Sequence, residues 1–469
     1  MKKTKIVATI SDLRCDVEFL RELYKSGVNV MRLNTAHQSL EDSKKVVANI
    51  RAVSKKIAIM IDTKGPEVRV MNLEKEIAVK FGDIIRFSDK AGMKDVVLVN
   101  YDGFVTDVPV GSLMYLDDAK VELRIEEKID GVLVARVLND GVIKNKKSVN
   151  VPNVSLNYPS LIPKDIEYIQ YAAENGIDFI AHSFVRNKAD VLGVKEIIAK
   201  FGGKTGVVAK IENQEGLDNI EDILDEAYAV MVARGDLAVE IPIEKVPFAQ
   251  SNLIKACIRR RKPVIVATQM MQSMCESPRP TRAEVSDVAN AIRLGADAIM
   301  TSDETTAGKY PIETIKMMSK IAFEVEKEFE EVNRFAVLSG SNEIVSFLAK
   351  MAVLASSQLK IRAIVCDSTS GRTARYLSAF RGDKLIFCEC YDEMVVRKLA
   401  LSYGVYSAYM DKETMGDDFV GLSLGTLLKR ADFSEEDLVV VLAGNYGVEH
   451  GASFVEISSI KNLIGSGKL

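Results

Sequence analysis

The sequence predicts an α/β protein: a (β/α)8 TIM barrel with an inserted all-β lid domain and a C-terminal α/β domain. Three observations support this. Short apolar runs alternate with amphipathic helical stretches through most of the chain before residue 311. This strand–helix alternation is interrupted once, between about residues 69 and 155, where the sequence predicts strands with alternating apolar residues, joined by tight turns. Strand–helix alternation then resumes after a long helical stretch at about 311–330.

Eight apolar runs rich in Val, Ile and Ala have the length and character of strands that are covered on both faces. Amphipathic helical stretches separate most of them. Eight strand–helix units in series are typical of a closed parallel barrel. The predicted strands cover residues 5–10, 28–34, 57–62, 178–184, 206–212, 228–234, 263–269 and 297–304.

Capping residues mark several of the predicted helices. Ser39 and Asp42 have the spacing of a capping box, and Thr281 and Glu284 repeat it. Pro163 suits the first turn of a helix, where its missing N–H costs nothing. These signals predict helices that follow residues 39, 162 and 281.

The inserted segment reads as paired strands. Val121, Leu123 and Ile125 alternate, the turn Asp130-Gly131 follows, and an apolar run returns. After residue 335, apolar runs at 361–366, 384–389, 405–410 and 437–442 predict a separate α/β domain. The predicted organisation is therefore 1–68 for the first part of the barrel, 69–155 for the lid, 156–335 for the second part of the barrel, and 336–469 for the C-terminal domain.

Charge and composition exclude several classes of protein. The 62 basic and 66 acidic residues give a net charge of −4, which argues against nucleic-acid binding driven by an overall positive charge. No apolar run approaches the roughly 18 residues of a membrane span, and the apolar stretch at the start is too short for a signal peptide. A cytoplasmic enzyme with reduced cysteines is expected. With only three histidines, its chemistry must come mainly from carboxylates, lysine and hydroxyls.

Polar and charged side chains collect where the predicted strands end, which is where barrel enzymes build their active sites. Polar strand ends are common, so each residue alone carries little weight. Lys210 and Glu212 alternate along one strand, so they point into the same space and need a partner or a ligand there. The other strand-end residues are Arg32, Asn34, Asp62, Lys64, Ser183, Arg186, Arg234, Asp236, Thr268, Ser302 and Glu304.

Glu212 and Asp236 come from neighbouring predicted strands. Two carboxylates with room for water and substrate oxygens suit Mg²⁺ or Mn²⁺. The alternative is that both acids form salt bridges, with Lys210 and Arg234.

Three cations, Arg32, Arg69 and Lys210, would lie near such an ion. Their charge indicates a strongly anionic substrate such as a phosphate ester. The alternative for Arg32 is a structural one, as the buried partner of Asp62.

At these residues the sequence resembles the pyruvate kinase family. The resemblance runs from the start to about Pro311 and continues more weakly to the end. Seven motifs carry it in the same order, at residues 28–34, 61–69, 183–186, 210–213, 233–240, 267–274 and 280–292. Members of this family transfer the phosphoryl group of phosphoenolpyruvate to ADP in glycolysis, giving pyruvate and ATP.

The resemblance implies a role for each matching residue. Glu212 and Asp236 would hold the Mg²⁺ or Mn²⁺ ion, and the backbone amides of Gly235 and Asp236 would receive the substrate carboxylate. Lys210 would offset charge on the phosphoryl group and the forming enolate. Arg32 would hold the phosphoryl group.

The same resemblance implies the remaining catalytic and nucleotide contacts. Thr268 would contact the substrate and help to route the proton to the enolate carbon, and Ser302 and Glu304 match the family's proton network. For His37 a packed loop residue is the alternative, and for Lys147 an ordinary solvated surface. The residues matched to nucleotide binding are Arg69, His37 and Lys147.

The family also binds K⁺ beside the phosphoryl group. The resemblance assigns this ion to Asn34, Asp62 and the carbonyl of Thr63. The family's serine ligand is replaced by Ala36, so one oxygen is missing. We expect K⁺ to bind with water in place of that hydroxyl.

The C-terminal domain has one candidate site. Its backbone amides, hydroxyls and one arginine suit a phosphate, and the resemblance implies a sugar-phosphate effector. A simple helix cap is the alternative. The resemblance also implies a homotetramer. The residues of the candidate site are Ser368, Thr369, Ser370, Gly371, Arg372 and Thr373.

Two other functions stay open. Mg²⁺-dependent aldolases or lyases that act on pyruvate enolate also pair Glu and Asp on neighbouring barrel strands, but they need neither the inserted β domain nor the segment 62–69. A catalytically reduced metabolite sensor is the second alternative, because Ala36, Ala119 and Asp303 depart from the family pattern.

Overall fold

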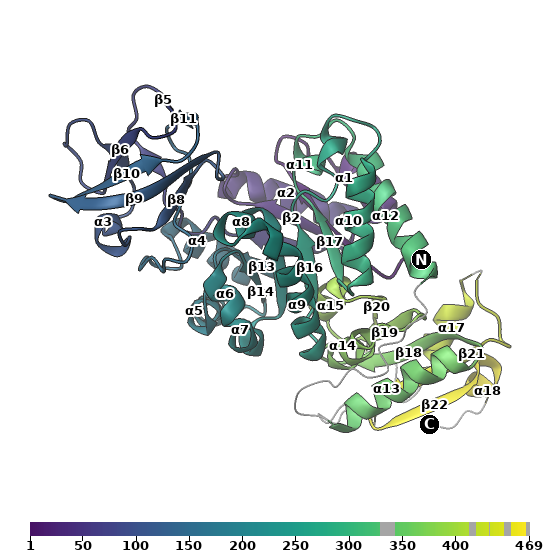
Figure 1. Cartoon of the computed structure of the whole chain (residues 1–469). Helices are drawn as coiled ribbons and strands as arrows, with labels where there is room; N and C mark the ends of the chain where they lie inside the picture. Colours follow the sequence, from purple (N-terminus) through teal and green to yellow (C-terminus); the bar gives the residue numbers. More distant parts are fainter. Residues whose placement is uncertain (329–342, 412–418, 431, 445–451, 466–469) are drawn as a thin grey trace.

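The computed structural model describes residues 1–328, 343–411, 419–430, 432–444 and 452–465 of the chain (Figure 1). It has a closed barrel, an inserted β-rich unit and a C-terminal α/β unit. Figure 1 shows the inserted unit at one end of the barrel and the C-terminal unit at the other. The predicted fold class is confirmed.

Eight parallel strands close the barrel in the order β1-β17-β16-β15-β14-β13-β3-β2. Nearly every strand residue is buried, which explains the continuous apolar runs in the sequence. All eight predicted strands are present. They are β1 (Lys5–Ile10), β2 (Val30–Asn34), β3 (Ala58–Asp62), β13 (Phe179–His182), β14 (Gly206–Ile211), β15 (Ala229–Ala233), β16 (Val264–Ala267) and β17 (Ala298–Thr301).

Helices follow the strands and pack around the barrel (Figure 1). The Ser39–Asp42 and Thr281–Glu284 capping boxes are both formed, and Pro163 opens its helix as predicted. These helices are α1 (Val17–Ser26), α2 (Leu40–Val53), α4 (Pro163–Glu174), α5 (Lys188–Lys200), α6 (Gln214–Asp218), α7 (Ile220–Glu226), α8 (Arg234–Glu240), α9 (Val246–Arg259), α10 (Arg282–Arg293), α11 (Asp303–Thr306) and α12 (Pro311–Lys327), with 3₁₀ turns η1 (Ile243–Lys245) and η2 (Gln272–Cys275).

The inserted unit lies between β3 and α4 and has its own apolar core. Its seven-stranded sheet has the order β12-β8-β9-β10-β6-β7-β4, and β11 pairs with β5. Asp130 and Gly131 both have positive φ angles and join β9 to β10, as the turn signal predicts. Its elements are β4 (Val70–Met71), β5 (Ile77–Val79), β6 (Ile84–Ser88), β7 (Val97–Val99), α3 (Phe104–Asp107), β8 (Leu113–Leu116), β9 (Val121–Ile129), β10 (Val132–Val137), β11 (Gly141–Ile143) and β12 (Val149–Asn150).

The C-terminal unit is a five-stranded sheet in the order β20-β19-β18-β21-β22, with β22 antiparallel. The four predicted strands are present, and β22 is an additional edge strand. Its elements are α13 (Glu343–Gln358), β18 (Ile361–Ser368), α14 (Arg372–Ala379), β19 (Ile386–Cys390), α15 (Glu393–Lys398), η3 (Leu399–Leu401), β20 (Val405–Tyr409), α17 (Phe419–Leu428), β21 (Leu438–Ala443), β22 (Phe454–Ser459) and α18 (Ile460–Gly465).

Of the predicted domain boundaries, the one between residues 335 and 336 lies outside the described residues. The boundaries at 68/69 and 155/156 stay predictions. All six cysteines are free thiols, and the sulfur atoms of Cys388 and Cys390 lie 3.8 Å apart. In the described part of the chain, no helix is both long enough and apolar enough to span a bilayer.

A buried carboxylate joins the barrel to the C-terminal unit at the end of the barrel where its strands begin. Asp178, directly before β13, accepts hydrogen bonds from Arg51 of α2 at 3.0 Å and from Arg397 of α15 at 2.6 Å. The Ile59 N–H donates to the same carboxylate at 2.8 Å. The C-terminal unit is thereby held on the side of the barrel away from the strand ends that carry the candidate site.

Asp178→Ala should destabilise the protein, because two cations and a backbone amide lose their buried acceptor. We expect a loss of about 3–5 kcal/mol, seen in calorimetry as a melting temperature lowered by about 5 °C or more. The control is Glu324→Ala, which breaks the exposed pair between Glu324 and Lys327. Equal melting temperatures for the two variants would contradict the assignment.

Candidate active site

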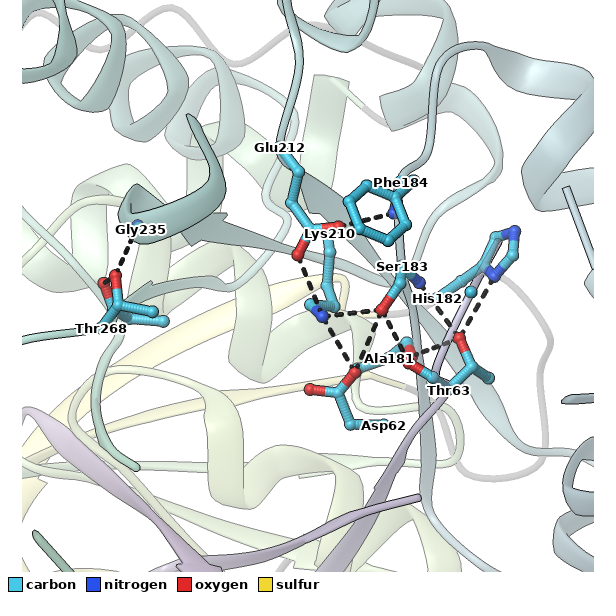
Figure 2. A network of polar contacts seen from close by, with 12 residues as sticks. Asp62, Thr63, Ala181, His182, Ser183, Phe184, Lys210, Glu212, Gly235 and Thr268 are labelled. Atoms are coloured by element: carbon cyan, nitrogen blue, oxygen red, sulfur yellow. Dashed lines mark hydrogen bonds and ion pairs between the residues drawn. The ribbon is translucent and has the colours of Figure 1, made fainter. Parts of the chain in front are cut away.

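Lys210 lies at the centre of a polar cluster at the open end of the barrel (Figure 2). Its ammonium is 2.7 Å from Ser183 Oγ, 3.1 Å from Asp62 Oδ1 and 3.0 Å from Glu212 Oε1. Burial alone would lower the pKa of Lys210, but the charges of Asp62 and Glu212 outweigh it and raise that pKa above its ordinary value. The lysine is therefore held as a cation.

Arg32 completes the cluster from the neighbouring strand β2. Its Nε donates to Asp62 Oδ2 at 2.6 Å, and its Nη1 donates to Thr9 Oγ1 at 2.8 Å. Burial alone would raise the pKa of Asp62, but Arg32 and Lys210 lower it below its ordinary value. Arg32 is thus the buried partner of Asp62, as the structural alternative held, and it also lies in the candidate site.

Glu212 follows β14 and is almost fully buried. Its Oε2 accepts the Phe184 N–H at 2.6 Å, while its Oε1 binds Lys210. Phe184 has a φ of 55°, a left-handed conformation that is costly for an aromatic residue. Burial raises the pKa of Glu212 to about 7 despite Lys210, and the nearby charge of Asp236 adds to the rise.

Asp236 lies in the first turn of α8, directly after β15. It interacts electrostatically with both Glu212 and Lys210. Arg234 pairs instead with Asp287 at 2.8 Å, and no ion pair of Asp236 is found among the described residues. The predicted alternative of two salt bridges therefore holds for Glu212 with Lys210 only.

A cavity of about 500 Å³ opens between the inserted unit and the barrel. Asp236 lines it, together with Glu67 and Asp118. Phe184 is part of its wall, whereas Lys210 and Glu212 are not. The cavity therefore reaches one of the two candidate metal ligands from the side of the inserted unit.

Thr268 and Gly235 meet at the ends of two neighbouring strands, apart from the lysine cluster (Figure 2). The Gly235 N–H donates to Thr268 Oγ1 at 2.8 Å, and this hydroxyl lies 2.6 Å from the Ala267 carbonyl. Thr268 has a φ of 67°, which is strained for a β-branched residue and aims its side chain at the α8 N-terminus.

Ser302 and Glu304 follow β17. The buried Glu304 carboxylate accepts the N–H of Ser302 at 2.7 Å and that of Met271 at 3.0 Å. In the structure this carboxylate therefore organises the backbone of two loops beside Thr268.

The matched K⁺ ligands lie on adjacent strands, where Asn34 and Asp62 are register partners. Asn34 Oδ1 accepts the Ala36 N–H at 3.1 Å, and the Thr63 carbonyl accepts the Ser183 hydroxyl at 2.7 Å. Asp62 is shared with Arg32 and Lys210. Asn34 and Asp62 thus lie side by side on adjacent strands, and Thr63 follows Asp62 directly.

The residues matched to nucleotide binding are more dispersed. Arg69 binds Glu67 at 2.7 Å and Lys147 binds Asp117 at 2.9 Å, both at the inserted unit. His37 is exposed in the loop after β2. Arg69 and Lys147 lie on paired backbone segments, but in the described part of the chain no hydrogen bond or ion pair joins the three side chains.

The candidate effector segment, residues 368–373, joins β18 to α14 in the C-terminal unit. Gly371 is the N-cap of α14, with a φ of 74° and no side-chain capping bond. Ser368 and Thr373 are buried, whereas Thr369, Ser370 and Arg372 are exposed. Gly371, rather than a serine or threonine, therefore caps the helix.

Sequence reasoning gave no role to two residues of the lysine cluster. Ser183 is one of the polar strand ends and begins the matched motif at 183–186, but neither gives it a role, because its contacts with Lys210 and Thr63 depend on how β13 lies between β3 and β14. His182 is fully buried, with Nδ1 3.5 Å from Thr63 Oγ1, and burial lowers its pKa to about 4. No local pattern signals either contact.

The carboxylates present fit a hard divalent cation. Among the described residues no group of three or more His, Cys, Asp or Glu side chains could hold a metal. Mg²⁺ commonly takes only one or two protein carboxylates and completes its shell with water and substrate oxygens. Glu212 and Asp236, two interacting acids beside two fixed cations, have that character.

Comparisons with known proteins agree along the whole chain. Residues 1–315 match the pyruvate kinase barrel domain, and residues 346–458 match the pyruvate kinase alpha/beta domain. The pyruvate kinase of Borreliella burgdorferi is 47% identical over 469 residues, covering 99% of this chain and 98% of that protein. The Bacillus licheniformis pyruvate kinase is 40% identical and covers 100% of this chain and 82% of its own length.

A solved structure leads to the same family. The crystal structure of a pyruvate kinase from Cryptosporidium parvum superposes with a TM-score of 0.92 at 31% sequence identity. The alignment covers 98% of this chain and 96% of that one. The family models together with these full-length relatives show that the chain belongs to the pyruvate kinase family.

Proposed function

We propose that this chain is a glycolytic pyruvate kinase that transfers the phosphoryl group of phosphoenolpyruvate to ADP, giving pyruvate and ATP. One observation carries the proposal beyond family membership. Lys210, Arg32 and the acids Asp62, Glu212 and Asp236 form one interacting group at the mouth of the barrel.

Phosphoryl transfer asks a protein mainly for positioning and for neutralisation of charge. Lys210 and Arg32 are fixed cations, and they would hold the phosphoryl oxygens. Lys210 would also stabilise the enolate that is left when the phosphoryl group departs. Its raised pKa means that it stays protonated while it does so.

Glu212 and Asp236 would hold the Mg²⁺ or Mn²⁺ ion. When bound, that ion would act as a Lewis acid toward phosphoryl and enolate oxygens. The cluster has three carboxylates, Asp62, Glu212 and Asp236, and only two cations, Arg32 and Lys210. The cluster alone therefore suits a cation before it suits an anionic substrate.

The backbone amides of Gly235 and Asp236 would receive the substrate carboxylate, and Thr268 would contact the substrate and help to route the proton that the enolate carbon must gain. The Gly235 amide now donates to the Thr268 hydroxyl, so substrate would take over that donor. Ser302 and Glu304 would support the proton route through the loop that they organise. Arg69, Lys147 and His37 would contact the nucleotide, close to the ion pairs that Arg69 and Lys147 form with Glu67 and Asp117.

The remaining assignments follow the family. Substrates phosphoenolpyruvate and ADP, K⁺ as a second cofactor, a homotetramer and a cytoplasmic location are all part of the proposal. So is a phosphate ester at residues 368–373. The inserted unit and the segment 62–69 set aside the aldolase or lyase alternative, which needs neither of them.

A coupled assay of pyruvate release from phosphoenolpyruvate, ADP and Mg²⁺ tests the proposal directly. The wild-type protein should turn over, and Lys210→Met should lose at least about 10³-fold in kcat, because the forming enolate loses its fixed cation. Lys262→Met is the control, since Lys262 donates to the Ala227 carbonyl at the opposite end of the barrel. Absence of wild-type turnover would favour a metabolite sensor, and a near-normal rate for Lys210→Met would refute its role.

The K⁺ assignment has its own test. Wild-type activity should be higher in K⁺ than in Na⁺ or tetramethylammonium, and Ala36→Ser should lower the K⁺ concentration for half-maximal activity several-fold by restoring the missing oxygen. Residue 36 is exposed, so the substitution should fold normally. Equal rates in all three salts would exclude the site.

A further inference from the structure

The Ser183 hydroxyl lies between two halves of the candidate site (Figure 2). On one side it accepts a hydrogen bond from Lys210 Nζ at 2.7 Å. On the other it donates to the Thr63 carbonyl at 2.7 Å and lies 3.4 Å from Asp62 Oδ1. One neutral group therefore joins the lysine to two of the matched K⁺ ligands.

The contact with Ser183 completes the hydrogen bonding of Lys210. An ammonium has three N–H donors, and this one has three acceptors within 3.1 Å, at Ser183, Asp62 and Glu212. The two carboxylates alone would pull the ammonium toward themselves. The serine oxygen accepts the third N–H, so Nζ is held in one position and does not shift between the two carboxylates.

The backbone around Ser183 is itself fixed from both neighbouring strands. The Ser183 N–H donates to Thr63 Oγ1 at 3.1 Å, and the next amide, of Phe184, donates to Glu212. Gly65 makes room for this arrangement, because a Cβ there would lie 2.9 Å from Ser183 Cβ and 2.8 Å from the Phe184 ring. The serine is only 2% exposed and has little freedom to move.

We propose that Ser183 is a positioning residue, which holds the Lys210 ammonium and the Thr63 carbonyl in one fixed geometry and so couples the K⁺ side of the site to the lysine. This inference rests on the proposed pyruvate kinase activity. It predicts that a displaced ammonium costs rate more than binding, since a small misplacement of a catalytic group lowers the rate strongly. It also predicts that this hydroxyl couples the binding of K⁺ to the binding of substrate, so that each raises the affinity for the other.

The kinetic test compares Ser183→Ala and Ser183→Cys with Ser356→Ala. The cysteine variant keeps a similar volume but loses the strong hydroxyl hydrogen bonds, so it separates hydrogen bonding from packing. Ser356 is equally buried and its hydroxyl also donates to a backbone carbonyl at 2.7 Å, but it lies in α13, remote from the site. We expect kcat to fall about tenfold in both Ser183 variants, with the KM for ADP unchanged, and Ser356→Ala to match the wild type.

A binding measurement tests the coupling without turnover. The chain has no tryptophan, so titration calorimetry is suitable. We expect wild-type protein with Mn²⁺ to bind phosphoenolpyruvate several-fold more tightly in K⁺ than in tetramethylammonium, and Ser183→Ala to lose most of that difference.

The outcomes separate this inference from the proposed activity. A wild-type protein that makes no pyruvate would defeat the proposed function. An active wild type with normal kcat in Ser183→Ala, or with kcat restored in Ser183→Cys, would overturn the positioning role. A salt dependence of binding that is absent from the wild type or is unchanged in Ser183→Ala would overturn the coupling.

Discussion

The buried ammonium of Lys210 is the interaction on which the rest of the site depends. A charge in a low-dielectric environment is stable only when it is paired and fully hydrogen-bonded. Asp62, Glu212 and Ser183 meet that demand from three different strand ends. Because the lysine needs all three, the ends of β3, β13 and β14 must stay in register, and the barrel supplies that register.

The two ends of the barrel have different roles: one end holds the C-terminal unit, and the other carries the candidate active site. At the ends where its strands begin, Asp178 joins α2 to α15, and Asp297 binds Arg381 at 2.6 Å and the Tyr403 N–H at 2.9 Å. These acids hold the C-terminal unit. At the opposite ends the chain adopts costly backbone angles at Phe184, whose N–H donates to Glu212, and at Thr268, whose hydroxyl accepts the Gly235 N–H. Strain of this kind persists only where the surrounding structure enforces it.

Much of this organisation could be predicted from the sequence, because local patterns encode it. Buried parallel strands produce continuous apolar runs, and capping boxes mark helix starts such as those at Ser39 and Thr281. The edge strand β22 was missed because its residues are mostly half-buried and show no apolar run. Motif resemblance identified Lys210 and Glu212, but the Ser183 contact depends on the packing of three strands far apart in sequence. The same limit applies to Arg69 and Lys147, whose partners are set by the inserted unit.

The central claim is that Glu212 and Asp236 hold a divalent ion beside the fixed ammonium of Lys210, which then contacts the substrate. The most direct test is a crystal structure of the protein with Mn²⁺ and phosphoenolpyruvate, in which anomalous scattering locates the metal. The account predicts one Mn²⁺ bound directly to carboxylate oxygens of both Glu212 and Asp236, with the Lys210 ammonium on a phosphoryl oxygen. Mn²⁺ bound elsewhere, or substrate bound without any contact to Lys210, would contradict it.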